Sequence, residues 1–451
     1  MMDGGSARAT DLAPAPARTA DRAPASGNRL GGGLIDRSRT LRFTFDGQAF
    51  TGHPGDTLAS ALMANGVRLL GRSFKYHRPR GVLGAGSEEP NALVTVTGRA
   101  TTPNTRATTL ELQDGLAAES QNRWPSLRHD LMAVNDALAP FLGAGFYYKT
   151  FMWPKAFWER VYEPVIRHAA GLGRLSTAPD PDTYDHGFLH CDLLVVGAGP
   201  AGLMAALEAG RAGARVILAD EDFLPGGRLN ADAGEIDGMA APDWAAQAVA
   251  ELRSLPSVRL MTRTTVFGVY DHGIHGAAEM AAPGAGGAAQ VLWRIYARRS
   301  LVCAGATERP IAFPDNDRPG ILMAGAARAY ANRWAAAPDR RIAVFANNDS
   351  GHAAAADLAA AGMDVAAVID TRADAPENPA AETLRGAVVV GTRGRHGLRE
   401  ITVRLADGGR RSIACGALAV SGGWNPNLHL TAQQRTRPVY DDTIAAFVPR
   451  P

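Results

Sequence analysis

Cysteine is scarce in this chain of 451 residues, and the three that occur are far apart in sequence. Cys191, Cys303 and Cys415 each lie at or in an apolar, strand-like run, and the sequence contains no CxxC pair. Redox disulfides and zinc sites usually need closely spaced thiols. We therefore interpret the three cysteines as buried thiols of a protein in a reducing compartment, and we predict no metal site.

Long apolar runs and a strong charge of one sign are also missing. Because no run reaches the roughly 18 apolar residues of a membrane helix, we predict no membrane span. The formal net charge of +2 comes without a basic stripe, so we expect no nucleic-acid partner. Residues 1–28 lack the apolar centre of a secretory signal, and their acids argue against a transit peptide. We expect a disordered tail there and a cytoplasmic protein.

The most informative stretch begins with an apolar run at residues 193–196 and ends with a second one at 216–219. Between them lie a small-residue helix and, before it, a glycine turn made of Gly197, Ala198, Gly199, Pro200, Ala201 and Gly202. Strand, turn, helix and strand in this order are typical of a Rossmann-type dinucleotide-binding unit. The three glycines would give the tight turn, the close approach of a pyrophosphate and the packing of helix on strand, respectively.

An acid follows the second strand at the spacing of a residue that accepts hydrogen bonds from an adenosine ribose. This acid is Asp220, and its charge disfavours a 2′-phosphate, so we predict NAD or FAD rather than NADP. Glu221 and the loop residues Gly226, Gly227 and Arg228 are predicted to lie beside the site. The alternative is a glycine-rich turn kept only for packing.

The N-terminal part predicts a ferredoxin-like β-grasp domain over residues 29–105. A hairpin is expected at residues 41–51, then a helix capped by Asp56 or Thr57, and a strand at 92–96. The loop at 84–91, where relatives of this fold carry cluster ligands, contains no cysteine, so we predict no iron–sulfur cluster. Residues 72–81 are dense in cations and form either a solvated turn or a contact with a cofactor phosphate or another subunit.

A helical connector is predicted over residues 106–190, with aromatic residues at 146–158 that favour packing over a ligand site. Beyond the first dinucleotide unit, the strand at 300–307 ends in small residues, and we expect Gly305 and Thr307 to contact the cofactor. The overall prediction is an α/β protein with two Rossmann-like domains after the β-grasp domain. The first dinucleotide-binding domain comprises residues 191–338 and 412–451, which the chain would re-enter at the strand 412–421.

The second Rossmann-like unit, inserted at residues 339–411, lacks the glycine fingerprint. Its predicted elements are a strand at 341–346, a helix at 349–361 and a strand at 363–370. The turn between the first two contains one glycine, and Asp349 at the start of the helix would repel a pyrophosphate. We therefore interpret this unit as a structural or docking domain.

Several longer stretches carry a resemblance to a known family. They are RSFKYHRPRG (72–81), GAGPAG (197–202), CAGATERPIAFPDNDRPGI (303–321) and AVSGGWNPNLHL (419–430). With the cysteine-free ferredoxin-like domain, they resemble the α subunit of the bacterial heterotetrameric sarcosine oxidases, from about Leu30 to the end. The resemblance implies that this chain is the N-terminal half of such a subunit, without the C-terminal folate-binding domain that is similar to aminomethyltransferases.

The resemblance also implies a function, namely the oxidative demethylation of sarcosine to glycine with formation of hydrogen peroxide. It implies NAD bound by this chain at GAGPAG, FAD in a partner β subunit, FMN at the interface between the two, tetrahydrofolate as one-carbon acceptor, and further γ and δ subunits. No residue of this chain is predicted to be catalytic. Two alternatives stay open, an FAD-binding subunit of a related opine or secondary-amine dehydrogenase and a non-catalytic scaffold remnant.

Overall fold

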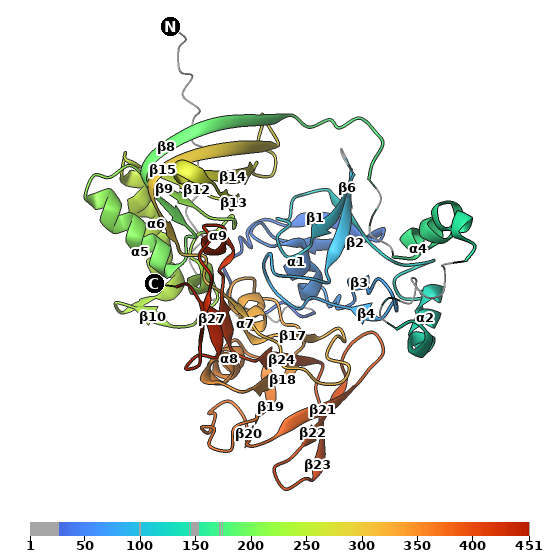
Figure 1. Ribbon diagram of the computed structural model, residues 1–451. Coiled ribbons are helices and arrows are strands. Elements are labelled where there is room, and N and C mark those ends of the chain that lie inside the picture. The colour runs from blue at the N-terminus through green and yellow to red at the C-terminus, as the bar shows by residue number, and fades with distance from the viewer. Residues whose placement is uncertain are drawn as a thin grey trace.

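The computed structural model describes residues 27–98, 101–143, 145, 153–170, 173 and 175–450. The chain forms a ferredoxin-like domain and two further α/β domains that lie against one another (Figure 1). The predicted disordered tail and the aromatic residues 146–152 fall almost entirely outside the described residues. Within the described part, no helix is long and apolar enough to cross a membrane.

The ferredoxin-like domain contains a five-stranded sheet in the order β2-β1-β7-β5-β6. Its hairpin is confirmed, because β1 pairs antiparallel with β2 through a turn at Asp46 and Gly47, which both have positive φ. Strand β7 lies beyond residue 105, so the sheet extends past the predicted end of this domain. The strands are β1 (Leu41–Phe45), β2 (Gln48–Gly52), β5 (Leu93–Thr97), β6 (Thr102–Arg106), β7 (Leu116–Ser120) and the small pair β3 (Gly71–Arg72) and β4 (Pro79–Arg80).

Helix α1 (Leu58–Ala64) packs all its residues into the core of this domain. Thr57 is the N-cap, and with Ser60 it forms a capping box, which settles the choice left between Asp56 and Thr57. Asp56 instead forms an ion pair with Arg29.

The connector contains short helical turns instead of long helices. Trp153 and Phe157 are 83% and 49% exposed, and the ring of Phe157 packs edge-on against that of Tyr162 at 6.2 Å. Most of the predicted aromatic cluster lies outside the described residues. The elements are η1 (Leu131–Ala133), α2 (Val134–Ala137), η2 (Ala139–Phe141), η3 (Lys155–Phe157), η4 (Trp158–Tyr162) and α4 (Glu163–Ala170).

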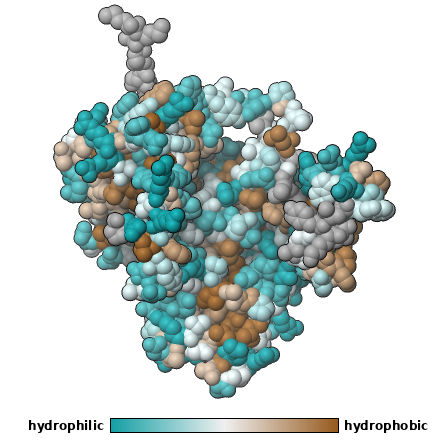
Figure 2. Space-filling model, viewed as in Figure 1, coloured by the Kyte–Doolittle hydropathy of each residue, from teal (hydrophilic) through white to brown (hydrophobic). Residues whose placement is uncertain are grey.

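The first dinucleotide-type domain contains a six-stranded sheet in the order β12-β9-β8-β15-β14-β13. Strands β8 and β15 pair in parallel along their length and form an arm that reaches toward the ferredoxin-like domain (Figure 1). The surface is hollowed beneath this arm (Figure 2). Strand β15 begins ten residues before the strand predicted at 300–307, and β8 begins seven residues before the predicted boundary at 191. The strands are β8 (Tyr184–Val196), β9 (Val216–Ala219), β12 (Val258–Met261), β13 (Thr264–Val269), β14 (Ile274–Met280) and β15 (Gln290–Val302).

Two helices cover one face of this sheet and form a core with it, α5 (Pro200–Arg211) and α6 (Ala241–Ser254). Gly202, Leu203, Ala206 and Leu207 of α5 are buried, a spacing that presents one helix face to the strands. The remaining short elements are η5 (Gly227–Asn230), β10 (Glu235–Ile236), β11 (Met239–Ala240), η6 (Asp271–Gly273) and β16 (Ala306–Glu308).

The second domain contains a five-stranded parallel sheet in the order β17-β24-β18-β19-β20, next to a three-stranded antiparallel sheet β21-β22-β23. Strand β24 lies between β17 and β18, so the prediction that residues 412–421 re-enter the first domain is wrong. All five residues of β24 are buried, and such an apolar run fits the parallel part of either large sheet. The chain returns toward the first domain only at β25 (Trp424–Pro426), which pairs with β16.

The elements of the second domain and the C-terminal part complete the fold. They are β17 (Ile321–Met323), α7 (Ala324–Asn332), β18 (Arg341–Ala346), α8 (Asp349–Ala360), β19 (Asp364–Asp370), β20 (Thr383–Leu384), β21 (Val388–Arg393), β22 (Glu400–Arg404), β23 (Arg410–Ala414), β24 (Ala417–Ser421), α9 (His429–Ala432), β26 (Val439–Asp441) and β27 (Ala446–Val448).

The ferredoxin-like domain and the second domain share one continuous hydrophobic core. Phe43 and Leu62 of the former belong to the same buried cluster as Tyr330 and Phe345 of the latter. Arg29 joins the two domains, because its guanidinium donates to Asp56 of the former and to the carbonyl oxygen of Trp334 of the latter, at 2.7 to 3.1 Å. The second domain therefore packs as a docking partner of the ferredoxin-like domain.

We predict that Arg29→Met destabilises the chain strongly. Asp56 is fully buried, so loss of its partner leaves an uncompensated buried charge, at a cost of about 3 to 5 kcal/mol. Denaturant unfolding of the full chain measures the effect. The matched control is Arg411→Met, whose ion pair with Glu382 is about half exposed, and its effect should be below about 1 kcal/mol. Equal losses of unfolding free energy in the two variants would contradict the role of Arg29 as the partner of a buried charge.

Candidate dinucleotide site

The turn after β8 requires glycine at two positions for steric reasons. Gly197 has φ +100°, and a Cβ there would lie 2.4 Å from the carbonyl oxygen of Cys303. A Cβ at Gly202 would lie 1.8 Å from the carbonyl oxygen of Gly197. Neither contact is possible, so no other residue fits without movement of the backbone. The strand that presses on the turn is the end of β15, where the amide of Cys303 donates to the carbonyl oxygen of Val196 at 2.7 Å.

Gly199 is different, because nothing lies within 4 Å of the position of a Cβ there. Its φ of −72° is also accessible to any residue. Neither packing nor backbone strain therefore explains a glycine at this point. Open space next to the backbone is what a phosphate group needs for close approach.

Helix α5 begins beside this space without a capping side chain. Its N-cap is Gly199 and its first residue is Pro200, and no side chain among the described residues caps the N–H groups of the first turn. Such free N–H groups, together with the positive end of the helix dipole, form a site for an anion. Ala201 and Gly202 supply two of these groups. The turn and the helix therefore fit the pyrophosphate of a dinucleotide.

Asp220 lies beside the turn, as predicted for the ribose-binding acid. Its carboxylate accepts from the amide of Ala198, and it also accepts from the amide of Asp222 at 2.8 Å. Burial, followed by the charge of Asp222, raises the pKa of Asp220 to about 6. A carboxylate oxygen has lone pairs beyond the one that each amide uses, so both oxygens can still accept from ribose hydroxyls.

The loop Gly226–Arg228 closes over the turn from the other side. The amide of Gly226 donates to the carbonyl oxygen of Ala198 at 2.8 Å, and a Cβ at Gly227 would lie 3.0 Å from the Cα atom of Gly199. The guanidinium of Arg228 lies 4.2 Å from the ring centre of Trp424, a cation–π contact. The fold thus brings this loop to the glycine turn.

Gly305 and Thr307 follow β15 and are fastened by one residue that sequence reasoning did not identify. The amide of Asn427 donates to the carbonyl oxygen of Gly305 at 3.0 Å, and the hydroxyl of Thr307 donates to the side-chain oxygen of Asn427 at 2.8 Å. These bonds hold the backbone of Gly305 two residues beyond Cys303, whose carbonyl oxygen borders the glycine turn. The Thr307 hydroxyl donates its proton to Asn427, so towards a ligand it can act only as an acceptor.

Glu221 binds a residue of the ferredoxin-like domain instead of facing the turn, because it accepts from the Ser87 hydroxyl at 2.7 Å. The neighbouring Asp222 links the first domain to the second domain, because it pairs with Arg333 at the end of α7 at 2.5 and 2.7 Å. Sequence reasoning missed Ser87, Asp222 and Arg333. Their partners are more than a hundred residues away, and no local pattern marks such a pair.

The second Rossmann-like unit holds its charged residues in internal pairs. Arg372 bonds both Asp349 and Asp370 at 2.8 Å, so the predicted repulsive charge at the start of α8 has a partner within the chain. His352 bonds the same oxygen of Asp370, Oδ2, at 2.8 Å. Asp370, the last residue of β19, is thus fully buried and bonded to residues of this unit.

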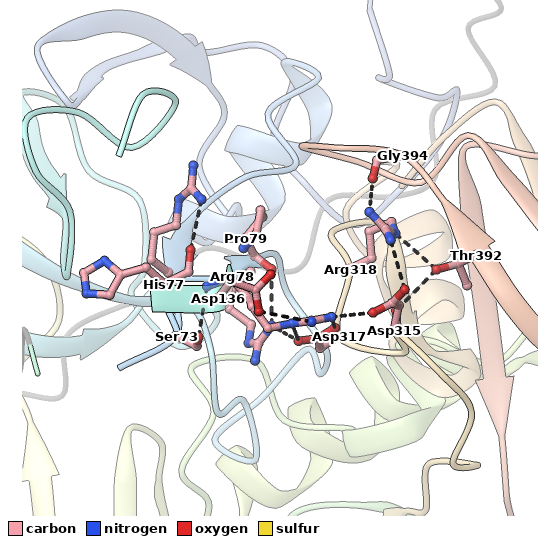
Figure 3. A network of polar contacts seen from close by, with 12 residues as sticks. Ser73, His77, Arg78, Pro79, Asp136, Asp315, Asp317, Arg318, Thr392 and Gly394 are labelled. Carbon is pink, nitrogen blue, oxygen red and sulfur yellow. Dashed lines mark hydrogen bonds and ion pairs between the residues drawn. The ribbon is translucent and has the colours of Figure 1, made fainter. Parts of the chain in front are cut away.

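The arginines of the cation-rich segment 72–81 form ion pairs and hydrogen bonds with other segments of the chain, so the segment is not a solvated turn. Arg78 and Arg80 form ion pairs with Asp317, and Arg78 also pairs with Asp315 at 2.6 Å (Figure 3). Arg72 donates to the carbonyl oxygens of Leu127 and His77. The segment joins the ferredoxin-like domain to the loop before β17.

The cysteines are free thiols, and the predicted burial is confirmed for Cys191 and Cys415, whereas Cys303 is only half-buried. Burial raises the pKa of the Cys191 thiol to about 11 and that of the Cys415 thiol to about 12. Within the part of the chain that the structure describes, no group of three His, Cys, Asp or Glu residues could hold a metal ion.

Comparison with protein families gives two matches. Residues 38–123 match the 2Fe-2S iron-sulfur cluster binding domain, and residues 192–271 match FAD dependent oxidoreductases. The first segment contains no cysteine, so it has the fold of that family without the thiolates that hold a cluster. The two matches confirm the predicted ferredoxin-like and Rossmann-type domains.

Curated relatives are similar over almost the whole chain. The sarcosine oxidase alpha subunit of Rhizobium meliloti (strain 1021) is 55% identical over 425 residues, and that of Corynebacterium sp. (strain P-1) is 39% identical over 435 residues. Both alignments cover 92% of this chain, but they cover 43% and 40% of the relatives, so the chain spans less than half of their length. The A subunit of opine oxidase from Agrobacterium tumefaciens (strain Ach5) is 31% identical over 205 residues, 44% of this chain and 39% of the relative.

A solved structure has the same fold. The L-proline dehydrogenase from P. horikoshii superposes with a TM-score of 0.62 at 18% identity, over 92% of this chain and 66% of that chain. At this identity the likeness concerns the fold alone.

We predict that Gly202→Ala and Gly199→Ala affect stability very differently. The first places a methyl group against the carbonyl oxygen of Gly197 and should cost about 1 to 3 kcal/mol or more in unfolding free energy. The second places it in open space and should stay within about 0.5 kcal/mol of the unsubstituted chain. Denaturant unfolding measures both. A Gly199→Ala variant as unstable as Gly202→Ala would refute the distinction between the two glycines.

Proposed function

Since this chain corresponds to the N-terminal part of the sarcosine oxidase α subunits, we propose that it is the dinucleotide-binding part of an oxidoreductase complex. The reaction proposed for that complex is the oxidative demethylation of sarcosine to glycine with formation of hydrogen peroxide. The observation that carries the proposal is the uncapped start of α5 beside the open space at Gly199. The proposal for the whole complex rests on relatives that are more than twice as long as this chain.

The proposed ligand of the first domain is NAD. Its pyrophosphate would lie at Gly199 and the first turn of α5, and its adenosine ribose would bind Asp220. These residues would contact only the ADP half of the ligand, which NAD and FAD share. FAD is therefore the alternative ligand, and the match to FAD dependent oxidoreductases favours it. When bound, either molecule can accept or donate a hydride.

The chain's own residues would hold the ligand in place. Free N–H groups at the start of α5 neutralise the pyrophosphate, while Asp220 fixes the orientation of the ribose. The loop of Gly226 and Gly227 shields the turn from one side, and the backbone at Gly305 borders it from another. No residue of this chain is proposed as a catalytic acid, base or nucleophile.

Amine oxidation is therefore proposed to take place on a partner subunit. The partner would be a flavin-carrying β subunit with FAD, FMN would lie at the interface, and smaller γ and δ subunits would complete a heterotetramer. The names of the relatives, which call them subunits, support an assembly of several chains. Tetrahydrofolate as one-carbon acceptor belongs to the same proposal for the complete complex.

A second candidate is the FAD-binding subunit of an opine or secondary-amine dehydrogenase. The observation in its favour is the similarity to the opine oxidase relative, which extends over 44% of this chain. The two candidates predict different ligands at the same turn, so the identity of the bound dinucleotide distinguishes them.

We predict that Gly199→Val abolishes dinucleotide binding and leaves the fold intact. The isopropyl group would occupy the space proposed for the pyrophosphate, and the backbone conformation there admits any residue. Calorimetric titration of the purified full chain with NAD, and separately with FAD, measures binding, and thermal unfolding verifies the fold. A folded Gly199→Val variant that binds as tightly as the unsubstituted chain would rule out this position for the pyrophosphate.

We also predict that dinucleotide affinity rises with pH up to about 6 and is flat above about 7. The pKa of Asp220 is about 6 without ligand, and ribose hydroxyls donate to the carboxylate, so the ligand lowers this pKa. Binding then releases a proton below pH 6, and the affinity changes by at most about tenfold per pH unit. Titrations between pH 5 and 8 in the Asp220→Asn variant should lose this dependence. An unchanged profile in the variant would assign the dependence to another group.

A further inference from the structure

A second cavity lies away from the dinucleotide turn, where the ferredoxin-like domain, the loop before β17 and the turn between β21 and β22 meet. Its volume is about 580 Å³. The connector before η1 also contributes to the lining. The arginine and histidine side chains that line the cavity are Arg72, Arg78, Arg128, His129, Arg318, Arg395 and His396. None of these residues belongs to the proposed dinucleotide site.

The acids that also line the cavity already have cationic partners. Asp315 and Asp317 pair with Arg78, and Arg318 bridges from Asp315 to the turn at Gly394 and to Thr392 (Figure 3). Asp130 is buried and accepts from the ring of His77 at 2.6 Å and from the amides of Trp124 and Met132. The fourth acid of the lining, Asp136, lies 3.5 Å from Arg78. Each acid of the lining therefore contacts a cationic or histidine side chain of this chain.

Arg128 and Arg395 are the cations left over. Within the described part of the chain, neither guanidinium has a hydrogen bond or an ion pair, although both line the cavity. Both line the same cavity as His396. Burial, followed by the charges of Arg72, Arg395, Arg128 and His129, lowers the pKa of that imidazole. Arg128 and Arg395 line one cavity without an acidic partner of their own among the described residues, so they repel one another, and an anion would relieve this repulsion.

We infer that this cavity binds a phosphate group between Arg128, Arg395 and His396, as free phosphate or as a phosphomonoester. Guanidinium groups donate two parallel N–H groups that match the oxygens of phosphate, and two of them from different segments would hold one dianion. The cavity is several times larger than a phosphate group, so the organic part of an ester would fit as well. The inference does not depend on the proposed function, because it uses no residue of the dinucleotide turn.

Calorimetric titration of the full chain with inorganic phosphate, at constant ionic strength, tests the inference. We expect saturable binding, and we expect the double variant Arg128→Gln and Arg395→Gln to weaken it at least about tenfold, since each substitution removes a charge-assisted contact. Both residues are exposed and unpaired, so the substitutions should leave the fold intact. The matched control is Arg437→Gln, an exposed arginine outside the cavity, which should bind phosphate like the unsubstituted chain.

Two further titrations separate this site from others and identify the source of the phosphate. The Gly199→Val variant should bind inorganic phosphate like the unsubstituted chain. Loss of phosphate binding in Gly199→Val, with binding retained in the double variant, would overturn the inference. Glycerol 3-phosphate that binds more tightly than inorganic phosphate, and loses affinity in the double variant, would identify an ester as the ligand. Equal affinities would identify free phosphate. Absence of saturable phosphate binding to the unsubstituted chain, or equal binding by the double variant, would also overturn the inference.

Discussion

The contact between the end of β15 and the glycine turn after β8 is the constraint on which the candidate site depends. Parallel pairing of the two strands brings the backbone of Cys303 against Gly197, and Gly202 must then pass the carbonyl oxygen of Gly197. Helix α5 consequently starts at a fixed point with its first N–H groups free. Gly199 is the one turn glycine that this packing does not require, and it borders the open space proposed for the pyrophosphate.

Arginine–carboxylate pairs between distant segments place the domains around that turn. Arg333 with Asp222, Arg263 with Glu111 and Arg78 with Asp317 all join segments more than a hundred residues apart. Planar guanidinium groups hold a carboxylate in a defined orientation, so such pairs fix geometry as well as proximity. The same device both closes the dinucleotide site from the ferredoxin-like side and builds the second, cationic cavity.

The sequence predicts well what short segments determine. The hairpin at Asp46, the capped helix at Thr57 and the glycine turn at 197–202 depend on neighbouring residues, and the structure contains all three. The sequence does not predict which strands or side chains pair when they are far apart in the chain. Residues 417–421 form an apolar strand that fits the parallel part of either large sheet, and the structure places them in the second domain. The contact of Glu221 with Ser87 depends on how two domains meet, which neither residue's local sequence indicates.

The central claim is that the first domain holds an adenine dinucleotide, and the most direct measurement identifies what the purified chain carries. Denaturation of the full chain, followed by mass spectrometry of the released small molecules and a visible spectrum of the native protein, gives the answer. The account predicts about one NAD per chain without flavin absorbance. One FAD per chain with a flavin spectrum would keep the site and favour the amine dehydrogenase alternative. A folded chain that carries no dinucleotide, and binds neither NAD nor FAD when they are added, would contradict the claim.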